Sequence, residues 1–193
     1  MSFRARRLTP LLVAGISVFG LQTAGGAAQS TTENSHGEIT FYDVKPCSSD
    51  GIGYEIVADV NAIEHESENA NGGHFTFTET GRFTARPIVV ELDADGNPVY
   101  DDGEGSLIPV LDAGGNVQYL DGETFHGRYT AWGGGNQTRG GQNSTFTFSV
   151  TGRGTDGGAF KENSTFHFTA EPGGDPFEDE SLLKVIFEHT RCH

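Results

Sequence analysis

The sequence predicts an all-β fold: an antiparallel β-barrel or, as the alternative, a closed β-sandwich, with about nine to eleven strands. Apolar and polar residues alternate with a period of two, as in Phe75–Phe77 and Phe146–Phe148. The 28 glycines make helices costly, whereas Phe, Thr and Val suit a pleated surface. A barrel is favoured over the sandwich because closure removes exposed strand edges.

The predicted strands are alternating runs that end at turn residues. In chain order they are 38–46, 53–65, 74–86, 88–93, 98–101, 106–112, 117–120, 123–132, 143–153, 159–170 and 182–191. The runs up to 86 are long, and 88–121 contains short runs separated by the Gly-containing turns 94–97 and 113–116. The later runs are rich in Phe and Thr and include the turn 155–158. The pattern therefore predicts hairpins joined in sequence.

Two segments of the chain occur twice. Leu92–Glu104 resembles Leu111–Glu123, and Phe75–Arg82 resembles Phe146–Arg153. Two copies are too few for a solenoid, so we expect hairpins that are reused within one sheet.

Residues 1–28 have the three parts of a secretion signal. A basic start with three arginines precedes an apolar stretch at Leu8–Thr23, and small residues lead to a cleavage site after Ala28. The apolar stretch is too short for a membrane span. We expect a disordered leader at 29–37 and a single β domain at 38–193. The predicted location is extracellular or cell-envelope, without membrane insertion once the signal is removed.

The chain is strongly acidic. Its formal net charge is −15, and loss of the three signal arginines lowers it to −18. Nucleic-acid binding needs clustered Lys and Arg to displace counterions, so this composition argues against a nucleic-acid partner.

Cys47 and Cys192 are the only cysteines. An even number in an exported chain predicts one disulfide, which would close a long loop and stabilise the fold by roughly 5 kcal/mol. The alternative is a pair of free thiols used in metal binding or redox chemistry, for which no C-x-x-C motif is present.

The C-terminal part resembles a known group of proteins. The segments that carry the resemblance are Gly122–Asn136, Asn143–Phe148, Thr151–Gly158, Phe166–Phe168 and a last strand that ends at Cys192. They are similar to the G-x-[FY]-x-x-W-G-G-x-N, T-F-x-F and G-x-G-[ST]-D-G landmarks of uncharacterised secreted β-rich proteins of high-GC Gram-positive bacteria. Gly73–Phe83 is more distantly similar, and 88–121 is an addition to the pattern. The resemblance implies a β fold and export, but no activity.

Two sets of residues have the chemistry of metal ligands. The first has the oxygen ligands and spacing of a calcium loop: Asp93, Asp95, Asn97, Asp101 and Glu104. Pro98 stands where such a loop needs Gly, so the favoured interpretation is an Asp-Gly hairpin with solvated carboxylates. The second has three imidazoles on one parity of three strands, suited to zinc or copper: His74, His126 and His167. The favoured alternative is exposed surface histidines, and no cofactor is expected beyond this calcium hypothesis.

A glycine-rich segment at 133–142 predicts either a flexible connector or the rim of a binding site for a small ligand or glycan. The rim residues are Trp132, Asn136 and Arg139, which offer a ring for stacking and polar groups for hydrogen bonds.

The leading functional hypothesis is a non-enzymatic binding or cell-envelope-associated module, because no catalytic motif is present in the sequence. One alternative is a barrel enzyme of the isomerase or lyase type, with His126, Arg128 and Tyr129 near the mouth of the barrel. Another is a calcium-responsive structural or adhesive surface protein.

Overall fold

The computed structural model describes residues 29–44, 52–101, 106–138, 141–170 and 183–192. Seven strands form one antiparallel sheet: β1 (Gln29–Val44), β2 (Gly53–Asn69), β3 (Gly72–Ile88), β4 (Phe125–Thr138), β5 (Gly141–Gly154), β6 (Ala159–Ala170) and β7 (Leu183–Cys192). Their order in the sheet is their order in the sequence, so the sheet is a meander with β1 and β7 at its edges. The predicted all-β, antiparallel class is confirmed. No helix among these residues is long and apolar enough to cross a membrane.

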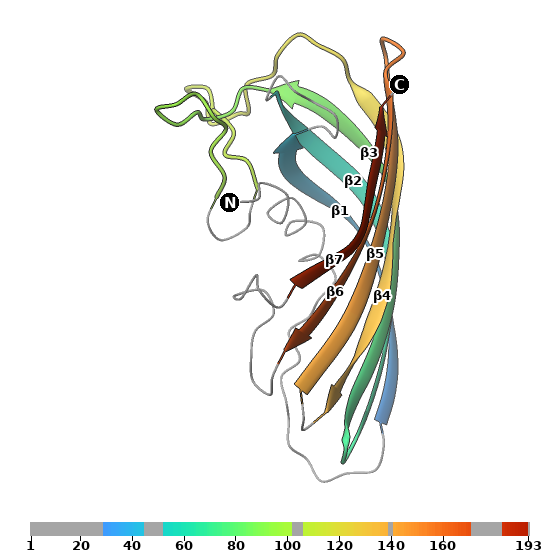
Figure 1. Cartoon of the computed structure of the whole chain (residues 1–193). Coiled ribbons are helices and arrows are strands. Elements are labelled where there is room, and N and C mark those ends of the chain that lie inside the picture. Colours follow the sequence, from blue (N-terminus) through green and yellow to red (C-terminus); the bar gives the residue numbers. More distant parts are fainter. Residues whose placement is uncertain (1–28, 45–51, 102–105, 139–140, 171–182, 193) are drawn as a thin grey trace.

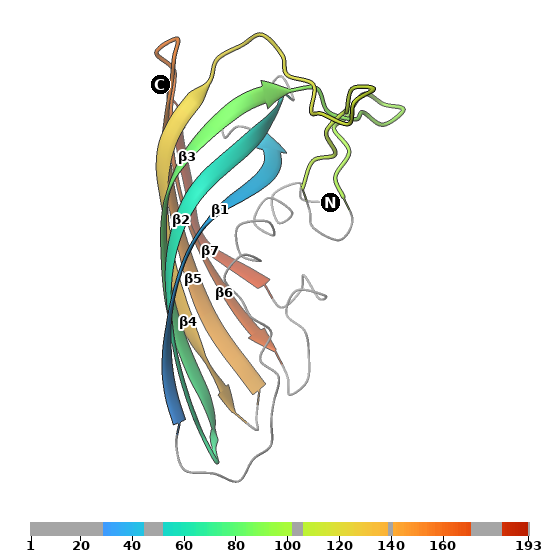
Figure 2. The ribbon, with the colours of Figure 1, turned by 180° about the vertical axis from the view of Figure 1, so that it is seen from behind.

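The sheet is curved into a trough and is not closed (Figures 1 and 2). The described residues therefore do not form the predicted barrel. An odd number of strands explains the difference in part: β1 and β7 run in the same direction, so closure would need a parallel pair at one seam of an otherwise antiparallel sheet. The predicted signal at 1–28 lies outside the described residues, as do Cys47, Glu104 and Arg139.

The leader predicted at 29–37 differs most from the structure, because these residues form the first part of β1. They pair with residues 60–68 of β2 in continuous register. Residues 30–38 are exposed, so this segment is ordered by backbone pairing rather than by burial. The side chain of Thr32 adds a hydrogen bond to His65 Nδ1 at 3.0 Å.

The described residues 89–101 and 106–121 form fewer strands than predicted. Their pairing is limited to isolated bridges, such as Val90 with Pro109 and Leu92 with Pro98. Proline has no N–H to donate, so a regular ladder cannot continue through these positions. Ser106 connects this segment to β1. Its hydroxyl accepts a hydrogen bond from the backbone N–H of Tyr42 and donates one to the backbone C=O of Tyr42, both at 3.1 Å.

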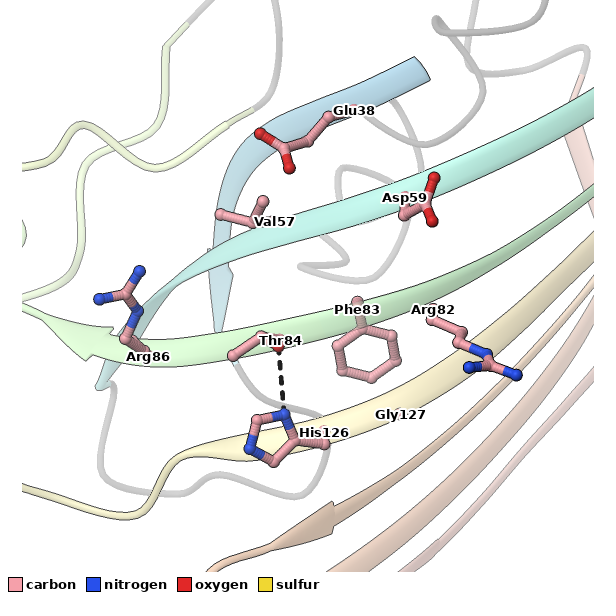
Figure 3. A pocket seen from close by; sticks show the side chains of 9 residues that line it. All are labelled: Glu38, Val57, Asp59, Arg82, Phe83, Thr84, Arg86, His126 and Gly127. Atoms are coloured by element: carbon pink, nitrogen blue, oxygen red, sulfur yellow. Dashed lines mark hydrogen bonds between the residues drawn. The ribbon is translucent and has the colours of Figure 1, made fainter. Parts of the chain in front are cut away.

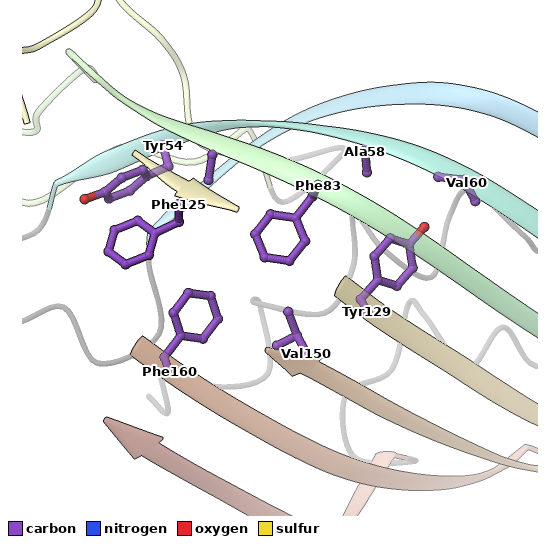
Figure 4. Close-up of a cluster of buried hydrophobic side chains, with 9 residues drawn as sticks. Tyr54, Ala58, Val60, Phe83, Phe125, Tyr129, Val150 and Phe160 are labelled. Atoms are coloured by element: carbon purple, nitrogen blue, oxygen red, sulfur yellow. The ribbon is translucent and has the colours of Figure 1, made fainter. Parts of the chain in front are cut away.

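The two faces of the sheet differ because neighbouring side chains on a strand point to opposite sides. On the inner face, a cluster of buried side chains from β2 to β6 packs together (Figure 4). Its members are Tyr54, Ala58, Val60, Phe83, Ala85, Phe125, Tyr129, Val150 and Phe160. A second inner cluster contains Phe77, Ala131 and Phe146. We call the opposite side the outer face.

Glycines on the inner face lie beneath aromatic rings from neighbouring strands. A Cβ atom on Gly127 would be 2.3 Å from the Phe83 ring, and one on Gly81 would be 2.3 Å from the Tyr129 ring. The segment 133–135, predicted in a loop, is part of β4, and a Cβ on Gly133 would meet the Phe146 ring at 2.8 Å. These glycines make room for the rings that fill the core.

Candidate functional site

A groove of about 580 Å³ lies on the outer face over β1 to β4 (Figure 3). Its lining residues are Glu38, Val57, Asp59, Arg82, Phe83, Thr84, Arg86, His126 and Gly127. The carboxylates come from β1 and β2, whereas the cationic groups and the imidazole come from β3 and β4. The groove therefore has an acidic side and a basic side.

Arg82 lies on the basic side of the groove. It is exposed and has no ion pair with any residue that the structure describes, although Asp59 is its register partner on β2. Asp59 is instead bound by His36, whose Nε2 lies 2.9 Å from Asp59 Oδ1. The Arg82 guanidinium is thus free to donate to a carboxylate, sulfate or phosphate.

Arg86 is held more firmly than Arg82. Its guanidinium lies 5.0 Å from the centre of the Tyr119 ring, and Nη2 is 4.0 Å from Glu55 Oε2. The Tyr119 hydroxyl donates to the same carboxylate at 2.7 Å. The hydrogen bond to Glu55 raises the pKa of the Tyr119 phenol. These contacts fix Arg86 at one end of the groove while its side chain stays exposed.

A buried acid lies on the inner face. Glu79 is 2% exposed, and Tyr129 donates its hydroxyl to Glu79 Oε1 at 2.5 Å. Burial raises the pKa of the Glu79 carboxyl, and the hydrogen bond from Tyr129 opposes that shift. Burial and the bond to Glu79 raise the pKa of the Tyr129 phenol far above its ordinary value. Tyr129 is therefore a permanent donor to Glu79, as expected of a structural pair.

The three residues suggested for a barrel enzyme are divided between the two faces. His126 and Arg128 are exposed on the outer face, whereas Tyr129 is buried on the inner face. The structure therefore brings His126 and Arg128 together, but separates both from Tyr129. Their alternating positions on one strand explain the separation.

The three histidines suggested for zinc or copper lie too far apart to share an ion. His126 and Asn136 are about 33 Å apart along β4, and His74 lies opposite Asn136. His167 is three strands from His74, or about 14 Å. Each imidazole instead forms a hydrogen bond with a side chain on the neighbouring strand. His74 Nδ1 lies 3.0 Å from Asn136 Oδ1, and His126 Nδ1 lies 3.1 Å from Thr84 Oγ1. His167 Nδ1 lies 2.9 Å from Thr145 Oγ1.

The suggested calcium ligands form a hairpin turn. The Asp93 carboxylate accepts hydrogen bonds from the backbone N–H groups of Asp95 at 2.9 Å and Asn97 at 2.8 Å. The hydrogen bonds from Asn97 lower the pKa of the Asp93 carboxyl. Asp112 makes the same contacts with Gly114 and Asn116. Asp101 is exposed, and Glu104 lies outside the described residues. The repeated sequence thus corresponds to two turns with the same hydrogen bonds.

Two of the three suggested rim residues can be located. Trp132 and Asn136 are both exposed on the outer face of β4, where Asn136 contacts His74. Arg139 lies outside the described residues. Cys192 ends β7, and because Cys47 also lies outside these residues, the disulfide stays a prediction.

Sequence reasoning missed Arg82 and Arg86, and it missed Glu79. The two arginines alternate with Phe83 and Ala85, so parity alone places them on the face away from the core. Glu79 shares the parity of Phe75 and Phe77, which identifies it as a charge on the apolar face. The chain matches no protein-family model, no curated protein and no solved structure.

Proposed function

We propose that the protein is an exported binding module that holds an anionic group in the outer groove. The observation that carries the proposal is Arg82, which lies in the groove without an ion pair among the described residues. Arg86 and His126 line the same side. A carboxylate, sulfate or phosphate at this position would receive charge-assisted hydrogen bonds from guanidinium groups.

The acidic side of the groove supports selection of how the ligand lies. Glu38 and Asp59 repel a second anionic group on the β1–β2 side, so the anion is directed towards β3 and β4. A neutral, hydroxyl-bearing part of the ligand fits between the two sides, beside Val57 and Thr84. The best ligand is therefore a monoanion with a polar body, such as an acidic sugar.

Calorimetric titration with sodium glucuronate and with sodium sulfate tests this proposal. We expect weak binding that Arg82→Ala reduces about two- to fivefold, the effect of one exposed ion pair. Asn71→Asp is the matched control, because it makes the same change in net charge in the exposed β2–β3 turn, away from the groove. No binding by the wild-type protein, or equal binding by Arg82→Ala, would contradict the proposal.

We further propose that a Cys47–Cys192 disulfide joins the two edges of the sheet and draws it towards a barrel. β1 and β7 run in the same direction, so their C-terminal ends lie at the same end of the sheet. Cys192 ends β7, and Cys47 follows Val44, the last residue of β1, by three positions in the sequence. Peptide mapping without reduction should recover the two cysteines in one linked fragment; two free thiols would rule this out.

Export is proposed from the signal pattern of residues 1–28. N-terminal sequencing of protein recovered from the medium of an expressing bacterium should begin at Gln29. Protein that stays in the cells with Met1 intact would argue against it.

A further inference from the structure

The outer face of β3 to β7 carries only positive charge among its described side chains. Its charged members are all exposed: Arg82, Arg86, Arg128, Arg153, Lys161 and Arg191. The only acids in the described parts of these five strands are Glu79, Glu162 and Glu188. Their register partners Ala131, Val150 and Ser164 are buried on the inner face. In a chain of net charge −15, the carboxylates are thus excluded from this surface.

Four of these cations form a row across the strands. Arg82 pairs with Arg128, Arg128 with Thr151, Thr151 with Lys161, and Lys161 with Arg191. Each residue of the row lies directly opposite the next one, and the row spans four strand spacings, or about 19 Å. Like charges directly across a sheet are unfavourable. Arg128 and Lys161 have no ion pair with any described residue that would relieve this repulsion.

A second row on the same face offers aromatic rings and hydroxyls. Trp132 is 44% exposed and Phe187 is 50% exposed. The register connects them through Thr147 and Thr165, whose hydroxyl oxygens lie 3.2 Å apart. Each ring lies four residues along its strand from a cation of the first row, or about 13 Å. Exposed rings stack on the faces of sugars, and hydroxyls bond to sugar hydroxyls.

We propose that this face binds an anionic polysaccharide that lies across β3 to β7, with its acidic groups on the cation row and sugar faces on the aromatic row. The inference rests on the proposed function, because Arg82 belongs both to the groove and to the row. A polysaccharide suits the surface better than a nucleic-acid duplex does, because the net negative charge of the chain repels a polymer with two phosphates per base pair more strongly than one with a single carboxylate per sugar. The row of cations also suits a chain better than a single sugar.

Fluorescence titration with polygalacturonate tests the inference, since Trp132 is the only tryptophan. We expect its emission to change on binding. Lys161→Ala/Arg191→Ala, which leaves the groove intact, should weaken binding about tenfold, from about threefold for each exposed cation. Asn69→Asp/Asn71→Asp is the matched control, because it changes the net charge equally at the β2–β3 turn.

The galacturonate monomer separates this inference from the proposed function. The monomer should depend on Arg82 and be insensitive to Lys161→Ala/Arg191→Ala, whereas the polymer should depend on both sites. Monomer binding with no gain for the polymer overturns the inference and leaves the groove proposal standing. Absence of binding by either probe overturns both. Equal binding of neutral dextran, tighter binding of single-stranded DNA, or full polymer binding by Lys161→Ala/Arg191→Ala also overturns the inference.

Discussion

The inner and outer faces of β3 to β6 are built from the same strands but have different chemistry. The inner face holds aromatic rings packed over glycines, and it places the buried acid Glu79 against Tyr129. The outer face holds exposed cations, hydroxyls and Trp132. Because successive side chains point to opposite faces, each strand contributes residues to both surfaces, and the residues of one face do not restrict the choice of residues on the other. The inner face therefore determines stability and leaves the outer face available for binding.

The placement of charge makes this division sharper. Glu79 loses solvation on the inner face, and it is tolerated because Tyr129 donates to it. Cations on the outer face stay hydrated, yet Arg82 and Arg128 lie directly opposite each other with no carboxylate between them. This like-charge pair is the observation from which we infer a ligand for the outer face.

The largest effect is expected from removal of an inner-face ring. Phe125 is 1% exposed and contacts the rings of Tyr54 and Phe160 at centroid distances of 5.7 and 5.8 Å. Phe125→Ala should lower the free energy of unfolding by about 3–5 kcal/mol, measured by chemical denaturation. Trp132→Ala, the outer-face control, should change it by no more than about 0.5 kcal/mol. Equal losses in the two variants would break the distinction between the faces.

The next effect concerns the buried hydrogen bond. Tyr129→Phe keeps the ring over Gly81 but leaves the Glu79 carboxyl without this donor. We expect a loss of about 2–3 kcal/mol at neutral pH, because a buried charged group loses its partner. Glu79→Gln/Tyr129→Phe should recover part of that loss in the same denaturation experiment. A Tyr129→Phe variant as stable as the wild type would show that water replaces the bond.

The sequence predicted the β class and most strand positions well. Alternation located β6 at its observed bounds, and glycine with aspartate located the turn at 155–158. These signals succeed because they are local. The segment 29–37 was predicted to be disordered because its sequence is polar. In the structure it pairs with β2 through its backbone, and a polar sequence does not reveal such pairing. Openness of the sheet depends on how its distant edges meet, which no local pattern encodes.

The site was predicted less well than the fold. Parity placed His74, His126 and His167 on the outer face correctly, but it gave no register between strands and so no distances. The structure places His126 at the end of the sheet away from His74. The groove was missed because its lining comes from four strands, and only their register brings Glu38 and Arg82 to one depression. Glycines at 133–135 indicated a loop because the neighbours that would meet a Cβ on them, such as the Phe146 ring at Gly133, lie on other strands.

A smaller effect is expected in the pH dependence of stability. Burial raises the pKa of Glu79 in the folded state above its ordinary value of 4.5. Its contribution to stability is therefore fully present below pH 4.5 and is lost as the pH rises through the folded-state pKa. Glu79→Gln removes this contribution, so the wild type should lose stability relative to the variant as the pH rises above 4.5. The difference should be smaller than the effect of Tyr129→Phe.

Thermal melting of the two proteins across this pH range measures that difference. The comparison cancels the contributions of the other titrating groups, including Glu64, whose pKa is also raised by burial, and Asp93, whose pKa is lowered by hydrogen bonds with Asn97. A difference that is constant with pH would mean that Glu79 titrates as it does in the unfolded chain.

The smallest effect on stability is expected from the cation row, and it separates binding from folding most directly. Lys161→Ala/Arg191→Ala removes two exposed like charges that are register partners. Because no described carboxylate forms an ion pair with Lys161, its loss breaks no favourable contact of that kind. Stability should change by at most about 0.5 kcal/mol and should rise slightly at low salt as repulsion is relieved. A large loss would assign the row to the fold; unchanged stability together with weakened polygalacturonate binding would assign it to a ligand.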